Sequence, residues 1–321
     1  MPDKNAVILG AGVSGLTCGV RLLEAGFSVR IKAHTLPPHT TSNVAPAYWY
    51  PYKVAPRERV LGWADFSYAK LTALSLVPGS GVSMSSLLKL FEEPVDEPFW
   101  KPAVRTFRRA RPEELPPGYA DGFVTEVPRI ETPVYMRYLE DSFVELGGEL
   151  EKLEREAASI EELMGDRLIL INCAGLGAGK LCRDENTFPI RGQIVIVKNI
   201  GLERITSVDT GRQAPIYIVP RDGDCILGGT AEENNWDLRV NPETSKKIIE
   251  KCAAIEPALV NAEILGHRVG LRPGRTGVRL ELEELPGGRA VIHDYGHGGA
   301  GFTLSWGCAE EVLNLAEGFL F

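Results

Sequence analysis

The chain has 321 residues, and this length predicts about two domains. Apolar residues make up 44% and charged residues 24%, a balance that is typical of globular proteins and excludes a disordered chain, a collagen or a coiled coil. The formal net charge of −8 disfavours nucleic acid as a partner, and no apolar run approaches the roughly 18 residues of a membrane span.

The beginning of the sequence and its cysteines together predict a cytoplasmic protein. Glycines interrupt the first apolar stretch, MPDKNAVILGAG, so this stretch lacks the pattern of a signal peptide. The cysteines are scattered without a CxxC pair, which predicts reduced, mostly buried thiols rather than a disulfide framework or a zinc site. They are Cys18, Cys173, Cys182, Cys225, Cys252 and Cys308.

The first 33 residues have the pattern of a βαβ unit. An apolar strand is expected over 5–10, an amphipathic helix over 13–25 with Gly26 as its stop, and an alternating second strand over 27–33. A long functional loop, rich in proline, threonine and aromatic residues, is expected over 34–60.

Helical and strand-like segments alternate along the rest of the chain. Helices are expected over 61–76, 131–147, 243–255 and 302–317, and strands over 167–172, 190–198, 215–219, 225–229, 278–283 and 289–293. The apolar run 167–172 suits a parallel sheet buried on both faces, whereas 190–229 has a more antiparallel pattern. The pattern predicts an α/β protein in which a nucleotide-binding domain is built from the separated segments 1–55, 129–187 and 262–321. A second, sheet-rich domain is formed by 56–128 and 188–261.

The motif GAGVSG between the first strand and the first helix predicts a dinucleotide site. Gly10 would permit the tight turn, Gly12 would let a pyrophosphate approach the backbone, and Gly15 would let helix and strand pack closely. The N–H groups at the start of the following helix would bind the phosphates.

The position about 20 residues further on departs from this motif. An acidic residue that binds ribose hydroxyls is expected there, but the sequence has Ala33 and His34. His34 could bind a ribose hydroxyl, could face the 2′-phosphate of NADP together with Lys32, or could simply be exposed.

A second glycine-rich segment, GLGAGK from Gly175 to Lys180, imitates a phosphate-binding loop. The spacing before Lys180 is one residue short, and Leu181 stands where a magnesium-binding Ser or Thr would be. We therefore expect only a strand-to-loop turn that passes near a cofactor.

The stretch HDYGHGGAG near the carboxyl end is rich in both histidine and glycine. His293, Asp294 and His297 could suggest a metal, but the glycines provide no rigid face to aim the two imidazoles, so no metal site is predicted. A serine hydrolase is also poorly supported because the chain has no GxSxG motif. Glycines followed by a helix at Gly301 instead suit a flat ring that carries negative charge, as a reduced flavin does.

The chain resembles the D-amino-acid oxidase family of FAD-dependent oxidases over essentially its whole length. The matching segments, in order, are AVILGAGVSGL, TTSNVAPAYWYPY, INCAGLGAG, RGQIVIV, YIVP, LGGT, NNW, GLRPGR, VRLE and HDYGHGGAGFTLSWGCA. The resemblance implies a Rossmann-type FAD-binding domain and a substrate domain with a large mixed, mostly antiparallel sheet. It also implies oxidative deamination of D-amino acids: a hydride passes to flavin N5, and the products are a 2-oxo acid, ammonia and hydrogen peroxide, with no residue required as an acid or base.

The resemblance also assigns site residues. Arg272 of GLRP would bind the substrate carboxylate through two parallel hydrogen bonds, Tyr217 of YIVP would donate to the same carboxylate, and the Gly299 carbonyl would accept from the amine. Tyr217 could also be a core residue of its strand. The expected FAD-binding residues are Gly10, Gly12, Val13, Ser14, Gly15, His34, Thr40, Thr41, Ser42, Ala47, Tyr48, Cys173, Ala174, Gly175, Gly298, Gly299, Gly301, Phe302 and Thr303.

The expected substrate class depends on two positions at which this chain differs from related oxidases. The second active-site tyrosine of vertebrate members, a few residues before YIVP, has no clear match. D-aspartate oxidases place an extra arginine just after LGGT, where this chain has Ala231, followed by Glu232 and Glu233 that would repel a second carboxylate if they faced the pocket. We therefore expect neutral, largely apolar D-amino acids, although Arg212 or Arg221 could substitute for the missing cation.

Other functions stay open at this stage. The nearest alternative is a D-aspartate oxidase, and a glycine- or sarcosine-type amine oxidase is more distant. A redox-silent protein that binds FAD or NADP is the alternative from another class. Besides a D-amino acid and dioxygen, the expected partners include no nucleic acid and no membrane, and a homodimer is possible.

Overall fold

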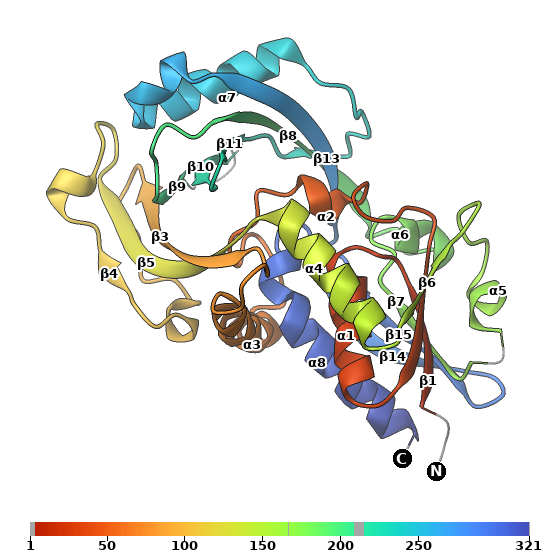
Figure 1. Ribbon diagram of the computed structural model, residues 1–321. Helices are drawn as coiled ribbons and strands as arrows, with labels where there is room; N and C mark the ends of the chain where they lie inside the picture. Colours follow the sequence, from red (N-terminus) through yellow and green to blue (C-terminus); the bar gives the residue numbers. More distant parts are fainter. Residues whose placement is uncertain (1–3, 166, 209–214, 321) are drawn as a thin grey trace.

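The computed structural model describes residues 4–165, 167–208 and 215–320, and it contains two sheets stacked along the molecule (Figure 1). The first sheet and its helices form the lower half of Figure 1, and the second sheet lies above them. Strands of the first sheet come from the start, middle and end of the chain. The expected α/β fold with a discontinuous nucleotide-binding domain is confirmed.

The first sheet is a parallel, Rossmann-type sheet with one antiparallel edge strand. Within the described residues its order is β14-β15-β7-β1-β2-β6, and only the β14–β15 pair is antiparallel. The central strands are almost wholly apolar and buried, as both faces of a covered parallel sheet require. The bounds are β1 Asn5–Leu9, β2 Ser28–Ala33, β6 Glu149–Lys152, β7 Ile169–Asn172, β14 Arg279–Leu285 and β15 Arg289–Tyr295.

Helices from distant parts of the sequence cover this sheet. The first helix, α1, packs against both α8 and α4, and α8 packs against α3. Most residues of α1 and every residue of α8 from Phe302 to Ala309 are buried, and they form one continuous core with the inner faces of both sheets. The bounds are α1 Val13–Glu24, α2 Thr41–Val44, α3 Arg57–Leu74, α4 Thr132–Glu145, α5 Ile160–Met164, α6 Gly177–Leu181 and α8 Gly301–Leu320.

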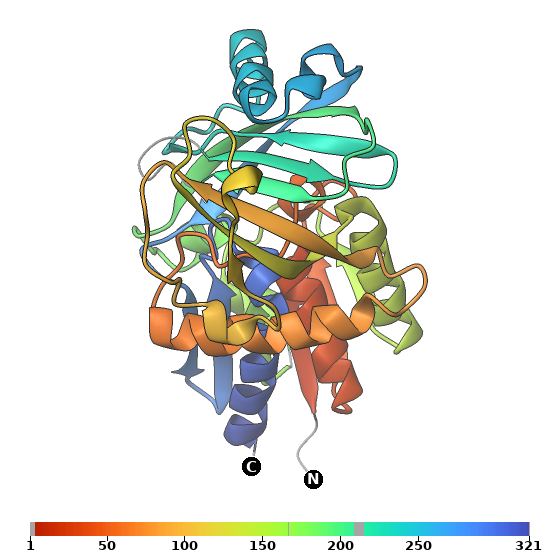
Figure 2. The same ribbon diagram turned by 90° about the vertical axis from the view of Figure 1, so that its left-hand side faces the viewer.

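The second sheet is mixed and mostly antiparallel, as expected. Its order is β12-β8-β11-β10-β9-β3-β5-β4, with β13 also paired to β8, and the β3–β9 pair is parallel. Helix α7 (Pro242–Ile255) packs on its outer face, on the side away from the first sheet (Figure 2). The strands are β3 Val82–Phe91, β4 Arg108–Arg109, β5 Asp121–Ile130, β8 Phe188–Lys198, β9 Ile205–Val208, β10 Ile216–Pro220, β11 Asp224–Gly228, β12 Glu232–Glu233 and β13 Ile264–Gly274; short 3₁₀ helices are η1 Lys101–Ala103, η2 Pro112–Glu114 and η3 Pro257–Asn261.

One strand of the segment 262–321, β13, lies in the second sheet. This strand was expected within the third cofactor segment, 262–321, but it pairs along its length with β8 of the second sheet. The strands β3 and β5, which pair over ten residues, were not among the strands expected from the sequence. The periodicity within each of these segments is local, whereas the partner of a strand is decided by distant residues.

Two other expectations concern the whole chain. No helix within residues 4–165, 167–208 and 215–320 combines the length and the apolar character that a membrane crossing requires. All six cysteines are free thiols, and five of them are buried, as expected. Burial raises the pKa values of Cys225 and Cys252 to about 12.

A buried carboxylate fastens the loop after α6 to the end of β15. Asp184, only 6% exposed, accepts hydrogen bonds of 2.8 Å from both Arg275 Nε and the Tyr295 hydroxyl. Burial alone would raise the pKa of Asp184, but these two donors outweigh it and lower the pKa to about 2.

We expect Asp184→Asn to lower the free energy of unfolding by about 2 kcal/mol at pH 7. Because the pKa is depressed in the folded state, this stabilisation is complete above pH ~4 and is lost as the pH falls towards 2. Urea denaturation of both proteins at pH 7 and pH 3 measures the difference, with the exposed Asp65→Asn as control. A difference that stays constant between these pH values would contradict the assignment.

Candidate active site

A cavity of about 780 Å³ lies between the two sheets and is lined by residues of both. Every site residue expected from the sequence lines it except Gly15: the GAGVSG turn, the loop from Thr40 to Tyr48, Cys173 to Gly175, and the stretch from Gly298 to Thr303. Tyr217 and Arg272 line the same cavity from the second sheet. Segments that are far apart in the sequence therefore converge on one site.

The three glycines of the GAGVSG turn have the geometry that was expected of each. Gly10 has φ +106°, and a Cβ there would lie 2.4 Å from the Cys173 carbonyl oxygen. A Cβ on Gly15 would lie 1.9 Å from the Gly10 carbonyl oxygen, so Gly15 lets α1 pack closely on β1 rather than lining the cavity. A Cβ on Gly12 would meet only Ser42 Oγ at 3.2 Å and would otherwise project into the cavity.

The N-terminus of α1 opens into the cavity beside Gly12. Helix α1 begins at Val13, and its N-cap residue, Gly12, has no side chain that could cap the helix. The Val13 N–H donates to Ser42 Oγ at 3.0 Å, which ties the loop before α2 to this end of the helix. Unpaired N–H groups and the positive end of a helix dipole are suited to a pyrophosphate.

His34 lies at the end of β2, is exposed and lines the cavity. Lys32 does not line it; instead its ammonium lies 3.9 Å from Glu151. The arrangement therefore favours a contact of His34 with a ribose hydroxyl over joint recognition of a 2′-phosphate.

We expect His34→Ala to weaken FAD binding by about 0.5–1.5 kcal/mol, the contribution of one ordinary hydrogen bond. Titration of the apoprotein with FAD, followed by quenching of flavin fluorescence, gives the two dissociation constants. Equal constants would show that His34 is only a surface residue.

The second glycine-rich segment forms the expected turn. Gly175 has φ +56°, and the chain turns there from β7 into the short helix α6. Lys180 lines the cavity but its ammonium lies 3.5 Å from Glu156. The segment thus borders the cofactor end of the cavity without forming a phosphate-binding loop.

The glycines before α8 bring the backbone to the cavity wall. Gly298 has φ +54°, and a Cβ on Gly299 would lie 3.1 Å from the Tyr52 ring. The Thr303 hydroxyl bonds both the N–H and the carbonyl of Tyr50 at 3.1 Å, so α8 is joined to the segment between α2 and α3. Backbone without side chains and a helix N-terminus suit a flat ring with negative charge.

The two histidines of this stretch point to different partners. His293 contacts Asn172 and Glu283 at 3.3 and 3.1 Å, whereas His297 Nε2 lies 3.1 Å from Asp294. Burial lowers the pKa of His293.

Thiols contact the same buried carboxylate. Asp294 Oδ2 lies 3.5 Å from Cys18 Sγ and 3.7 Å from Cys173 Sγ. Their mutual hydrogen bond and burial raise the pKa of Cys18, and burial raises that of Cys173. Both thiols therefore stay protonated and donate to Asp294.

Arg272 and Tyr217 form the polar end of the cavity on the second sheet. The Arg272 guanidinium lies across Gly192, where a Cβ would be 2.2 Å from Nη1, and Nη1 donates to the Thr230 carbonyl at 3.0 Å. The Tyr217 ring packs on Gly228, and its buried hydroxyl has no hydrogen-bond partner in the described part of the chain. Burial raises the pKa of Tyr217, while the Arg272 charge opposes this shift. A cation and an unused donor together suit a carboxylate.

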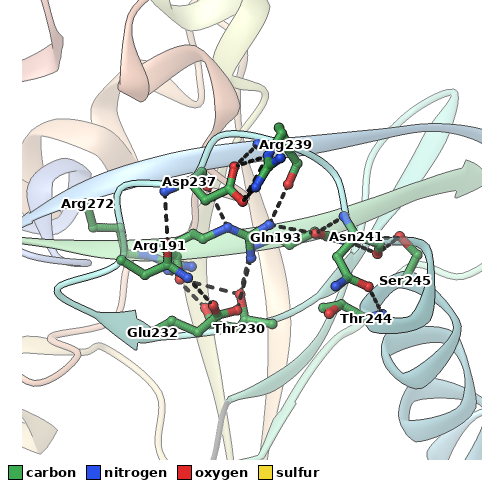
Figure 3. Close-up of polar contacts among 11 residues, drawn as sticks. Arg191, Gln193, Thr230, Glu232, Asp237, Arg239, Asn241, Thr244, Ser245 and Arg272 are labelled. Atoms are coloured by element: carbon green, nitrogen blue, oxygen red, sulfur yellow. Dashed lines mark hydrogen bonds and ion pairs between the residues drawn. The ribbon is translucent and has the colours of Figure 1, made fainter.

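Residues that were expected to influence the side-chain specificity do not line the cavity. Glu232 is paired with the buried Arg191 at 3.0 Å (Figure 3), and neither Ala231 nor Glu233 reaches the cavity. The condition under which these acidic residues would repel a second carboxylate, that they face the pocket, is therefore not met. Arg221 is paired with Asp224 at 2.6 Å, and Arg212 lies outside the described residues.

Tyr50, Tyr52, Lys89 and Ser207 are among the cavity residues that were not singled out from the sequence. Tyr50 and Tyr52 come from the YWYPY stretch, where they alternate with the buried Trp49 and Pro51, so the alternation along this stretch was the available signal. Lys89 and Ser207 lie on β3 and β9, and the lysine within the apolar run LLKLF was the corresponding signal there. Residues 209–214, a few positions before YIVP, where a counterpart of the second active-site tyrosine was sought, lie outside the described residues.

Comparisons with known proteins agree with this geometry. The family described as FAD dependent oxidoreductase matches residues 5–315. A D-amino-acid oxidase of Rubrobacter xylanophilus is 48% identical over 313 residues, which cover 97% of this chain and 95% of that protein. A D-aspartate oxidase of Homo sapiens is 35% identical over 331 residues, which cover 99% of this chain and 96% of that protein.

Solved structures with low sequence identity share the fold. Glycine oxidase from Geobacillus kaustophilus superposes with a TM-score of 0.81 at 20% identity, covering 97% of this chain and 94% of that one. A glycerophosphate oxidase from Mycoplasma pneumoniae with FAD bound has a TM-score of 0.75 at 14% identity. The superposition covers 99% of this chain and 95% of that one.

Proposed function

Because the chain belongs to the FAD dependent oxidoreductase family, we propose that it is a D-amino-acid oxidase that deaminates neutral D-amino acids. The observation that carries this proposal is that the Arg272 guanidinium and the unused Tyr217 hydroxyl both line one end of the cavity. These two groups match an α-carboxylate, and the remainder of the cavity has room for a dinucleotide.

The residues at the cofactor end fit FAD. Gly12 leaves the N-terminus of α1 open to the pyrophosphate, and His34 would lie beside a ribose. The backbone from Gly298 to Gly301 would lie along the flavin, with the N-terminus of α8 near its most negative edge. FAD, when bound, supplies the hydride acceptor of the reaction.

The protein's own contribution is orientation of the substrate. Arg272 would hold the carboxylate through two parallel hydrogen bonds, Tyr217 would donate a third, and the Gly299 carbonyl would accept from the amine. Three fixed contacts around the α-carbon aim its C–H at one face and thereby select one enantiomer. No side chain is needed as a general acid or base, and the products are a 2-oxo acid, ammonia and hydrogen peroxide.

The neutral substrate class rests on the named relatives. Several curated relatives are D-amino-acid oxidases, and the human D-aspartate oxidase is less similar than the one from Rubrobacter xylanophilus. D-aspartate oxidation is therefore the second candidate, and a glycine- or sarcosine-type amine oxidase is the third. We also propose a cytoplasmic location and a homodimer.

The test is a substrate panel with detection of hydrogen peroxide. The FAD-loaded protein should oxidise D-alanine, D-valine and D-phenylalanine with higher kcat/KM than D-aspartate and D-glutamate, and should leave the L-enantiomers unchanged. Anaerobic addition of D-alanine should bleach the flavin absorbance. Higher values for the acidic pair would make the chain a D-aspartate oxidase, and a flavin that no amine bleaches would refute oxidase function.

A further inference from the structure

A row of polar residues crosses the cavity face of the second sheet. Ser207 on β9 is in register with Tyr217 on β10 on one side and with Lys89 on β3 on the other. Residues in register on neighbouring strands share a face of the sheet, and strands lie about 4.8 Å apart. Lys89 therefore stands about 10 Å along the sheet from the tyrosine that would bind the substrate carboxylate.

Alternation along β3 explains why a lysine faces the cavity. Leu88 and Leu90 pack on the opposite face of the sheet, in a separate apolar cluster. Lys89 alternates with them and lines the cavity, although its side chain is only 2% exposed to solvent. A buried ammonium at this position is costly unless polar groups contact it.

The groups around Lys89 form a cluster of polar contacts in the cavity wall. The Lys89 ammonium donates to Ser207 Oγ at 3.1 Å, and the Tyr48 hydroxyl donates to the same oxygen at 3.1 Å. The ammonium also lies over the Tyr50 ring, 4.6 Å from its centre. Because Ser207 Oγ accepts both bonds, its own O–H is available to a further acceptor, and all four residues line the cavity.

We propose that Lys89 and Ser207 form a side-chain subsite that binds an oxygen acceptor at the end of the substrate side chain. The inference rests on the proposed function, because Arg272 and Tyr217 are taken to hold the carboxylate at the other end of the row. Amide and carboxylate oxygens share the required chemistry. The chain then accepts D-glutamine and D-asparagine better than apolar side chains of similar size, which lack an acceptor for these donors.

The test compares kcat/KM for the pairs D-glutamine against D-methionine and D-asparagine against D-leucine. In Lys89→Met, which keeps the length of the side chain, the ratio within each pair should fall about tenfold or more; in Ser207→Ala it should fall less. Lys246→Met, an exposed lysine on α7, is the matched control and should keep the wild-type ratios. D-glutamate, measured alongside, distinguishes an amide subsite from a carboxylate subsite.

A binding measurement keeps the subsite separate from the oxidase proposal. Glutaramate and hexanoate lack the amine, so they bind without turnover and their dissociation constants follow from changes in flavin absorbance. Tighter binding of glutaramate that is lost in Lys89→Met supports the subsite even if no D-amino acid is oxidised. Unchanged ratios, of kcat/KM or of dissociation constants, in a flavin-loaded Lys89→Met protein would overturn it.

Discussion

Replacing Arg272 by alanine is expected to raise KM for D-alanine steeply and to lower kcat/KM, while FAD binding is retained. The change in kcat/KM should correspond to a loss of about 2–5 kcal/mol of binding free energy. The loss is large because the Tyr217 hydroxyl alone cannot balance a desolvated carboxylate. Arg272 lies on β13, on the second sheet, away from the turn that would hold the pyrophosphate. Steady-state kinetics and the flavin absorbance of the purified protein measure the two effects.

Two further variants test whether the effect depends on the shape of the Arg272 side chain and whether it is specific to this position of the strand. Arg272→Lys should also be poor, because an ammonium cannot make two parallel hydrogen bonds to one carboxylate. Arg268→Ala, at an exposed position on the same strand, should leave the kinetics unchanged. A nearly normal KM in a folded Arg272→Ala protein would show that the carboxylate binds elsewhere.

Replacing Gly12 by valine is expected to give a folded protein that no longer binds FAD. The backbone of Gly12 has φ −78°, which any residue can adopt, and the new side chain would meet only Ser42 Oγ before entering the cavity. The valine side chain would occupy the place of the pyrophosphate. At least two charge-assisted hydrogen bonds between the pyrophosphate and the N–H groups at the start of α1 would then be lost. The dissociation constant for FAD should therefore rise on the order of 100-fold or more.

Circular dichroism and flavin fluorescence distinguish loss of the cofactor from loss of the fold. Gly62→Val, in open space on α3, is the matched control and should bind FAD normally. Gly15→Ala should instead destabilise the fold, because its Cβ would collide with the Gly10 carbonyl oxygen. Full flavin occupancy in Gly12→Val would place the cofactor outside this cavity.

Features that depend on neighbouring residues could be predicted from the sequence. The GAGVSG turn needs its glycines for reasons that lie within one strand, one turn and one helix, so Gly10, Gly12 and Gly15 have the expected geometry. Helices such as α4 and α7 were predicted to within a few residues because their apolar positions repeat at helical spacing. The family resemblance added Arg272 and Tyr217, which no local pattern indicates.

Features that depend on pairing between distant segments were decided only in the tertiary structure. The sequence of β13 is compatible with either half of the molecule, and its register with β8 assigns it to the second sheet. Whether Glu232 faces the substrate pocket was open from the sequence, and in the structure it is paired with the buried Arg191 and does not line the cavity. Lys89 faces the cavity because β3 pairs with β5 and β9 in one register, and a shift by one residue would have turned it to the opposite face. A single sequence determines which residues alternate along a strand, but the direction in which each set points is fixed by cross-strand hydrogen bonds and by burial against partners far away in the chain.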